Sequence, residues 1–354
     1  MTADNVARRI VADAIAPQCG TGCAIRVDGT WRRELGGSVD VLFDLASVTK
    51  PMSALALART GIDRRLPLGA ALPEARGTAS ESVALELFLA HRAGLEGHRP
   101  VFAPLLRGEK VDIRAALRDA ADARREDARG DPPAEGFTPL YSDLGYILVG
   151  EALARMTATP DAGASIERLV LEPLGIADHA GTVRELAARG VRGPFAPTET
   201  VSWRGGPICG AVHDENAWAL TGFGGSGHAG IFATVGAVIT FGAAILDTLD
   251  GANAPFGAPC DIDWMVGERA GGSLRAGFDG KSSEGSSAGD RMGRRSFGHL
   301  GFTGTSLWMD PDSKVVVALL TNRVSPSRDH IAIRAARPSA HDALVERALT
   351  LKIG

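Results

Sequence analysis

The tetrapeptide Ser47-Val48-Thr49-Lys50 places a hydroxyl and an amine three residues apart at the start of an expected helix. With about 3.6 residues per turn, positions i and i+3 share a helix face, so the amine can reach the hydroxyl. A serine attacks a carbonyl carbon after a base removes its proton, and a lysine serves as that base when its pKa is lowered. The spacing therefore indicates a serine nucleophile, although it also fits a helix N-cap with a solvated lysine.

Two further motifs contain residues that could assist this serine. Tyr141-Ser142-Asp143 precedes an expected helix and contains one of the 2 tyrosines in the chain. His299-Leu300-Gly301 opens a strand-like run near the C-terminal end. In this order the three motifs resemble those of the serine β-lactamase and penicillin-binding-protein superfamily. The chain looks most similar to the class C branch, which includes esterases, D-aminopeptidases and acyltransferases. Supporting segments are Leu87–Leu95, Leu171–Gly175, Val212–Ala217 and Phe302–Pro311.

The resemblance implies a role for each motif residue. Ser47 would be the acylated nucleophile, and Lys50 and Tyr141 would share its proton as a coupled pair. The N–H groups of Ser47 and Phe302 would form the oxyanion hole. The other substrate and oxyanion positions would be His299, Gly301 and Asp143.

Two departures from the family pattern bear on the substrate. Asp143 stands where β-lactamases usually have asparagine, and a carboxylate can only accept hydrogen bonds unless it is protonated. His299 replaces the lysine common in penicillin-recognising members, so a fixed positive charge is lost. Both departures weaken the expectation of β-lactam turnover.

We therefore expect a serine hydrolase that forms an acyl-enzyme on Ser47 and hydrolyses small carboxylic esters or amides. The alternatives of the same fold are a D-amino-acid amidase or peptidase, a β-lactamase and an acyltransferase. A non-catalytic binding homologue that acylates and stalls is a further alternative, because fold alone does not imply function. The mechanism implies no metal and no organic cofactor, and the sequence does not specify the oligomeric state.

Composition limits the class of protein and its partners. The chain has 354 residues, 45% of them hydrophobic and 23% charged, with a net charge of −4. These values indicate a globular protein, and they argue against nucleic acid or a membrane as a partner. The expected partner is the small-molecule ester or amide substrate that the resemblance implies. The charged N-terminal residues do not read as a signal peptide, so we expect a cytoplasmic location. The apolar stretch Gly230–Leu246 is expected to be a buried helix N-capped by Thr234.

The order of elements predicts an α+β fold. An antiparallel sheet would form from N- and C-terminal segments flanked by terminal helices, with a mostly helical lobe inserted, as in β-lactamases and transpeptidases. We expect one catalytic unit over residues 1–354, with a sheet lobe at 1–70 and 230–354 and a helical lobe at 71–229. Its expected parts include a hairpin around Asp28-Gly29, strands at Leu300–Met309 and Lys314–Thr321, a mobile loop at Gly271–Ser296 and a last helix at Ala340–Leu351.

A few remaining residues have weaker signals. Arg294 and Arg295 lie just before the third motif and are the better candidates for contact with an anionic substrate, although paired arginines are most simply solvated. His91 is expected to satisfy the backbone of its loop. His213 and His228 could line the cleft, but histidines in glycine-rich turns are more often structural.

Overall fold

The computed structural model describes residues 1–352, and its centre is a six-stranded antiparallel sheet. The strand order is β2-β1-β11-β10-β9-β8, so the N-terminal hairpin pairs directly with the last strand of the chain. This arrangement confirms the predicted α+β class. The hairpin turns at Asp28-Gly29, as the sequence predicts. The strands are β1 (Cys19–Val27), β2 (Thr30–Gly37), β8 (Asp279–Gly280), β9 (Phe297–Leu300), β10 (Ser306–Asp310) and β11 (Val315–Thr321).

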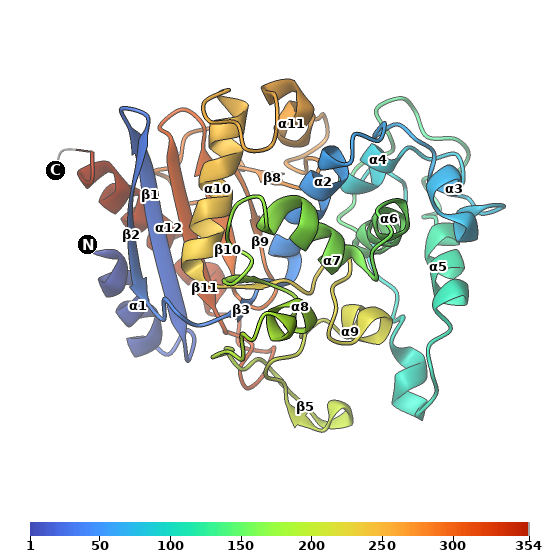
Figure 1. The fold of residues 1–354 in the computed structure, drawn as a ribbon, viewed down its shortest axis with the longest axis horizontal. Coiled ribbons are helices and arrows are strands. Elements are labelled where there is room, and N and C mark those ends of the chain that lie inside the picture. The colour runs from blue at the N-terminus through green and yellow to red at the C-terminus, as the bar shows by residue number, and fades with distance from the viewer. Residues whose placement is uncertain (353–354) are drawn as a thin grey trace.

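Helices cover both faces of this sheet. Helices α1 (Ala3–Ala12) and α12 (Ile333–Thr350) lie on one face, and α10 (Val235–Leu249) lies on the other (Figure 1). Strand β11 is buried on both faces, which explains its unbroken apolar sequence. Its alternate side chains enter different cores: Val315, Val317 and Leu319 pack towards α1 and α12, and Val316, Ala318 and Leu320 towards α10.

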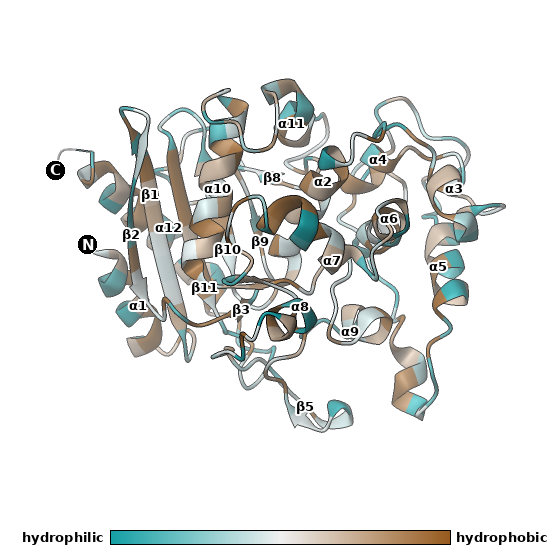
Figure 2. Cartoon of the chain, viewed as in Figure 1, coloured by the Kyte–Doolittle hydropathy of each residue, from teal (hydrophilic) through white to brown (hydrophobic). Residues whose placement is uncertain are grey.

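Helix α10 confirms the prediction made for the apolar stretch. Thr234 caps its N-terminus, where the hydroxyl accepts a hydrogen bond from the Ala237 N–H. Most of the helix is apolar (Figure 2). It approaches the sheet closely, because a Cβ on Gly22 or on Gly242 would lie 2.7 Å from Ile239 or from Val316, respectively. Within residues 1–352, no helix is long and apolar enough to cross a membrane.

Most of the shorter helices gather beside the sheet, on the right of Figure 1. Helices α2 and α6 pack against each other there, and they carry residues of the first two motifs. A three-stranded sheet, β3-β7-β4, lies beside them. The helices are α2 (Thr49–Arg59), α3 (Leu68–Ala71), α4 (Leu85–Leu89), α5 (Ile113–Asp122), α6 (Asp143–Met156), α7 (Ala162–Ile166), α8 (Val183–Ala188), α9 (Glu215–Thr221) and α11 (Pro259–Val266). The short strands are β3 (Phe43–Asp44), β4 (Ala180–Gly181), β5 (Thr200–Val201), β6 (Gly206–Pro207) and β7 (Phe232–Ala233).

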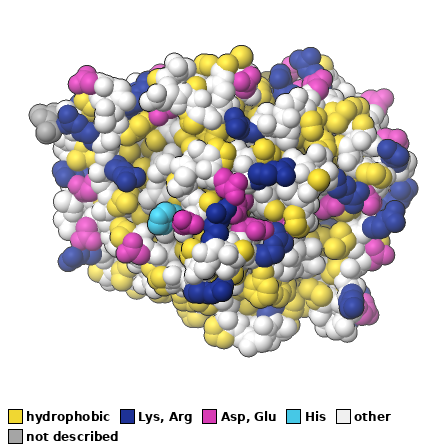
Figure 3. All heavy atoms as spheres, viewed as in Figure 1, with side chains coloured by type: hydrophobic (Ala, Val, Ile, Leu, Met, Phe, Trp, Pro, Cys, Tyr) yellow, Lys and Arg dark blue, Asp and Glu magenta, His cyan; other side chains and the backbone are white. Residues whose placement is uncertain are grey.

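Three boundaries differ from the prediction. The run Leu300–Met309 is two strands, β9 and β10, because a turn with Gly304 at φ 108° separates them. Helix α12 begins at Ile333 instead of Ala340 and continues through Pro338. The segment Gly271–Ser296, predicted as a loop, contains the edge strand β8 and buries apolar side chains such as Phe278 and Met292. The mixed charges on the face in Figure 3 agree with the near-neutral composition.

Candidate active site

The turn that presents Ser47 is held by one local hydrogen bond and by one from a distant part of the chain. The Ala46 N–H donates to the Asp44 carboxylate over 2.8 Å, and Ala46 has a φ of 47°, in the left-handed region that most residues avoid. The Thr305 hydroxyl, which follows the third motif, donates to the Leu45 carbonyl over 2.9 Å. A strained turn persists where its surroundings determine it, so these contacts fix the position of Ser47 at the start of the helical segment.

Lys50 connects the first two motifs. Its side chain is fully buried, and its Nζ donates to Ser47 Oγ over 2.9 Å and to Asp143 Oδ1 over 2.7 Å. Ser47 lies one turn earlier on the same face, as the spacing predicts, while Asp143 opens α6. The structure therefore brings the serine, the lysine and the aspartate into one hydrogen-bonded group.

A lysine must be neutral in order to accept a proton, but the surroundings of Lys50 favour its charged form. Burial by itself lowers the pKa of Lys50, but the Asp143 carboxylate, with help from Tyr141, raises it well above its ordinary value. The same ion pair outweighs burial at Asp143 and lowers the pKa of that carboxyl. Burial raises the pKa of Tyr141, against the opposing effect of Lys50. The resting site thus holds an ammonium–carboxylate pair beside a neutral phenol.

Tyr141 lies over this pair and is held by His91. The two rings stack with centroids 4.6 Å apart, and Lys50 Nζ lies 4.8 Å from the tyrosine ring centroid. His91 Nδ1 accepts a hydrogen bond from the Ser142 N–H over 3.0 Å, which confirms the prediction that this histidine satisfies loop backbone. Tyr141 remains 37% exposed, so a substrate can reach it from the cavity.

Leu300 and Gly301 of the third motif line the cavity beside Ser47, whereas His299 is not among its lining residues. In the part of the chain that the structure describes, the N–H groups of Ser47 and Phe302 make no hydrogen bond, and both residues line the same cavity. Glycine at position 301 allows this strand end to lie against the turn that presents Ser47, because a Cβ there would lie 2.5 Å from the Leu45 carbonyl oxygen. Arg337 Nη2 donates to the Gly301 carbonyl over 3.0 Å. Two unpaired N–H groups at such a site suit an oxyanion.

His299 is a neutral group in this structure. Its ring is buried, and its Nδ1–H donates to the Leu300 carbonyl over 2.9 Å. Burial, reinforced by the Lys50 charge, lowers its pKa to about 3. His299 therefore supplies no positive charge at neutral pH, and any cation that binds a substrate must come from elsewhere.

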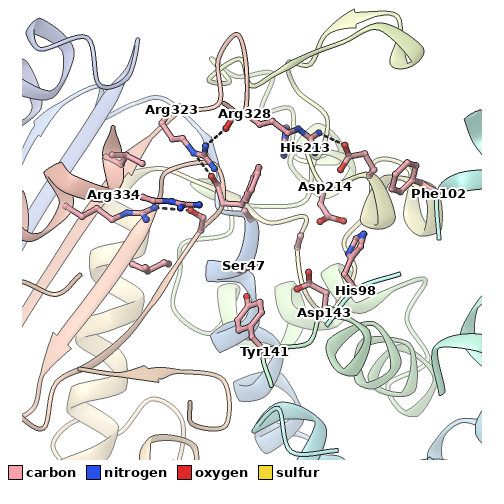
Figure 4. Close-up of a pocket in the computed structure, with 18 residues that line it drawn as sticks. Ser47, His98, Phe102, Tyr141, Asp143, His213, Asp214, Arg323, Arg328 and Arg334 are labelled. Carbon is pink, nitrogen blue, oxygen red and sulfur yellow. Dashed lines mark hydrogen bonds and ion pairs between the residues drawn. The ribbon is translucent and has the colours of Figure 1, made fainter. Parts of the chain in front are cut away.

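Such cations form one wall of the cavity. The cavity has a volume of about 480 Å³. Figure 4 shows Ser47 between arginines on one side and acidic residues with His98 on the other. The lining residues are Ala46, Ser47, His98, Phe102, Tyr141, Asp143, His213, Asp214, Glu215, Ala229, Leu300, Gly301, Phe302, Arg323, Arg328, Ile333, Arg334 and Arg337.

The arginines of this wall differ in how far they are neutralised. Arg328 forms ion pairs with Glu199 and Glu215. Arg323 donates from Nε to the Phe302 carbonyl over 2.8 Å and lies over that ring. Arg334 is exposed on the first turn of α12 and, within residues 1–352, pairs with no carboxylate.

The arginines of this wall were not predicted from the sequence. The last helix was predicted to begin at Ala340, so Arg334 and Arg337 lay outside any predicted element. Arg323 lies two residues after the end of β11, and Arg328 lies in the loop that follows. The position of Arg323 just after a strand that leads to the site was the available signal. Of the weaker candidates, His213 lines the cavity, whereas His228 lies behind it and bonds Asp214 Oδ1 over 2.8 Å.

Three buried histidines predict a specific dependence of stability on pH. Burial lowers the pKa of His91 and His299 to about 3, and that of His341, which accepts from Ser306 over 2.8 Å, to about 4. In the unfolded chain a histidine titrates near pH 6.5, so below that pH the unfolded state binds more protons. Their stabilising contribution is therefore complete above about pH 6.5 and is lost as the pH falls towards these folded values.

We expect the free energy of unfolding to fall by about 1.4 kcal/mol per histidine for each pH unit below 6. Urea titrations at pH 8, 7, 6 and 5 measure this slope. His341→Gln should reduce it, while His330→Gln, at an exposed position, should leave it unchanged. A stability that does not change between pH 7 and 5 would contradict the prediction.

Comparison with known proteins agrees with the fold. The β-lactamase family model matches residues 19–341, which include all seven candidate site residues. The chain belongs to the β-lactamase family, whose members are serine hydrolases.

Curated relatives match part of the chain, and solved structures share its fold. A Salmonella gallinarum protein named "Putative D-alanyl-D-alanine carboxypeptidase" is 28% identical over 207 residues, 52% of this chain and 45% of the relative. The chain thus matches about half the length of that relative. A class C β-lactamase from Rhodobacter sphaeroides superposes with a TM-score of 0.65 at 16% identity, covering 98% of this chain and 99% of the other. EstCE1, a hydrolase with promiscuous acyltransferase activity, superposes with a TM-score of 0.63 at 18% identity, and the match covers 94% of this chain and 96% of the other.

Proposed function

We propose that the protein hydrolyses small carboxylic esters or amides through an acyl-enzyme on Ser47. The observation that carries the proposal is the 2.9 Å hydrogen bond between Lys50 Nζ and Ser47 Oγ at a cavity wall. A carbonyl carbon next to Ser47 Oγ would place its oxygen towards the N–H groups of Ser47 and Phe302.

The reaction needs a route for the serine proton. Tyr141 and Lys50 titrate as one coupled system, and the reactive form is the minor one in which this pair has already lost one proton to solvent. As Ser47 Oγ attacks, its proton passes to the position that was vacated on the pair. The same group then protonates the leaving alcohol or amine. A water molecule attacks the acyl carbon in the second half of the reaction, with the proton transfers reversed.

Intact-mass spectrometry tests this proposal directly. After mixing with p-nitrophenyl butyrate, the wild type should gain one butyryl group and release nitrophenol continuously, whereas Ser47→Ala should gain none. A mass gain without continued release would favour a stalled binding protein or an acyltransferase that lacks its acceptor. No adduct on folded protein would reject the proposed function.

A second candidate, a peptidase or amidase for substrates that carry a carboxylate, is favoured by the arginine wall. Arg334 is a cation without a carboxylate partner among the described residues, while Asp214 and Asp143 lie across the cavity (Figure 4). A short amide with a carboxylate near Arg334 and an amine near Asp214 would match both charges. The activity named for the Salmonella relative involves such a carboxylate.

We expect Arg334→Ala to raise KM for an acyl donor with a carboxylate on its leaving group about tenfold more than KM for its neutral methyl-ester counterpart. Steady-state kinetics on the two substrates measure this ratio. Arg8→Ala, which removes an exposed arginine of α1, is the matched control and should leave the ratio unchanged. Equal changes for both substrates would show that Arg334 does not recognise the carboxylate.

A further inference from the structure

A second cavity, of about 800 Å³, shares no lining residue with the one that contains Ser47. It is built from the loop after α11, from β8 and from the loop that follows (Figure 1). Four cations line it, and the one carboxylate among its lining residues is Glu268, which is exposed. The cations are Arg269, Arg275, Lys281 and Arg294.

Arg275 is the buried member of this set. Its Nη1 donates to the Val266 carbonyl over 2.8 Å, and its Nη2 lies 3.8 Å from Glu268, beyond hydrogen-bond distance. The guanidinium lies directly against Gly280, where a Cβ would be 2.8 Å from Nε and from Nη2. Burial lowers the pKa of Arg275, and the nearby carboxylates of Glu268 and Asp279 oppose this effect only in part.

The other three cations are also incompletely neutralised. Lys281 donates to the carbonyls of Asp290 and Met292, which carry no full charge. Arg269 lies 3.8 Å from Glu86, and its buried Nε has no hydrogen-bond partner within residues 1–352. Arg294, one of the two arginines that the sequence analysis associated with anions, is exposed at the rim.

A buried cation is normally paired, and a cavity that gathers four cations, one of them buried, around one exposed carboxylate lacks negative charge. Serine hydroxyls at 273, 282 and 283 add neutral donors to the same wall. Arginine forks, an ammonium and hydroxyls together suit the oxygens of a phosphoryl group better than a single carboxylate, because a phosphoryl group accepts more bonds and carries more charge.

We propose that this cavity binds a soluble small molecule that carries a phosphate or pyrophosphate group. The site is separate from Ser47, so the proposal stands or falls independently of the hydrolase activity. The second cavity adjoins β9, the strand of the third motif, because Gly280 lines the cavity and pairs with Phe297 of β9, two residues before His299.

Isothermal titration of the full chain with pyrophosphate at constant ionic strength tests the proposal. We expect saturable binding to the wild type and a loss of affinity of about tenfold in both Arg294→Gln and Lys281→Gln, since each removes one charge-assisted contact. Arg295→Gln is the matched control: this neighbour pairs with Asp312 instead of lining the cavity, and its affinity should stay within about twofold of the wild type.

Three results would overturn the proposal. The first is no binding at millimolar pyrophosphate by protein that unfolds with the wild-type thermal midpoint. The second is an equal loss of pyrophosphate affinity in Arg294→Gln and Arg295→Gln, which would indicate that binding depends on general surface charge and not on this cavity. The third is binding to phosphatidic-acid vesicles without binding of pyrophosphate, which would indicate a lipid headgroup at a membrane surface instead of a soluble ligand.

Discussion

Lys50→Met is expected to slow the acylation of Ser47 by about 10²–10⁴-fold, the usual contribution of a positioned acid–base group. The substitution keeps most of the side-chain volume in this fully buried position, but it removes the amine that contacts Ser47 Oγ at 2.9 Å. The rate of nitrophenol release in the first turnover measures acylation directly, before hydrolysis of the acyl-enzyme contributes.

A second substitution separates two roles of Lys50. Lys50→Arg keeps a positive charge beside Asp143 but cannot give up its proton at accessible pH. If Lys50 transfers protons, Lys50→Arg should be about as slow as Lys50→Met. If the lysine only supplies charge, Lys50→Arg should retain most of the acylation rate, and this result would contradict the proton-transfer role. Thermal unfolding of both variants shows whether the larger guanidinium is tolerated.

Asp143→Asn is expected to shift the pH dependence of acylation downwards by at least about one unit and to raise the rate at pH 7 about tenfold. The Asp143 carboxylate raises the pKa of Lys50 and also contributes to the raised pKa of Tyr141. Without that charge, burial of Lys50 dominates and its pKa falls. A larger fraction of the Lys50–Tyr141 system can then accept the serine proton at a given pH. An asparagine amide can also donate a hydrogen bond to a substrate carbonyl.

The pH profile of kcat/KM for p-nitrophenyl butyrate measures this shift. Asp214→Asn is the matched control, because Asp214 is another carboxylate of the cavity but is hydrogen-bonded to His228 instead of Lys50. Its profile should move less than that of Asp143→Asn. A fall in rate at every pH in Asp143→Asn would show that the carboxylate itself takes part in proton transfer, contrary to this prediction.

Much of the fold could be predicted because its signals are local. The Asp28-Gly29 turn predicted the hairpin, and Thr234 before an uncharged stretch predicted the start of α10. Boundaries were predicted less well where tertiary contacts override local signals. Helix α12 starts before Pro338, and its N-terminal part is anchored by Arg337, which donates to the carbonyls of Gly301 and Thr305.

The sequence by itself determined the chemistry available to this protein: a serine, a lysine and a tyrosine in ordered motifs, with an aspartate and a histidine at two unusual positions. These positions can be read from the chain because the Ser47–Lys50 spacing is local and the order of the motifs is a property of the sequence itself. The protonation state of Lys50 depended on tertiary structure, since Asp143, 93 residues away, reaches its buried ammonium. The same is true of the arginine wall and of the second basic cavity. Charge and burial depend on which distant groups meet, and only the folded chain decides that.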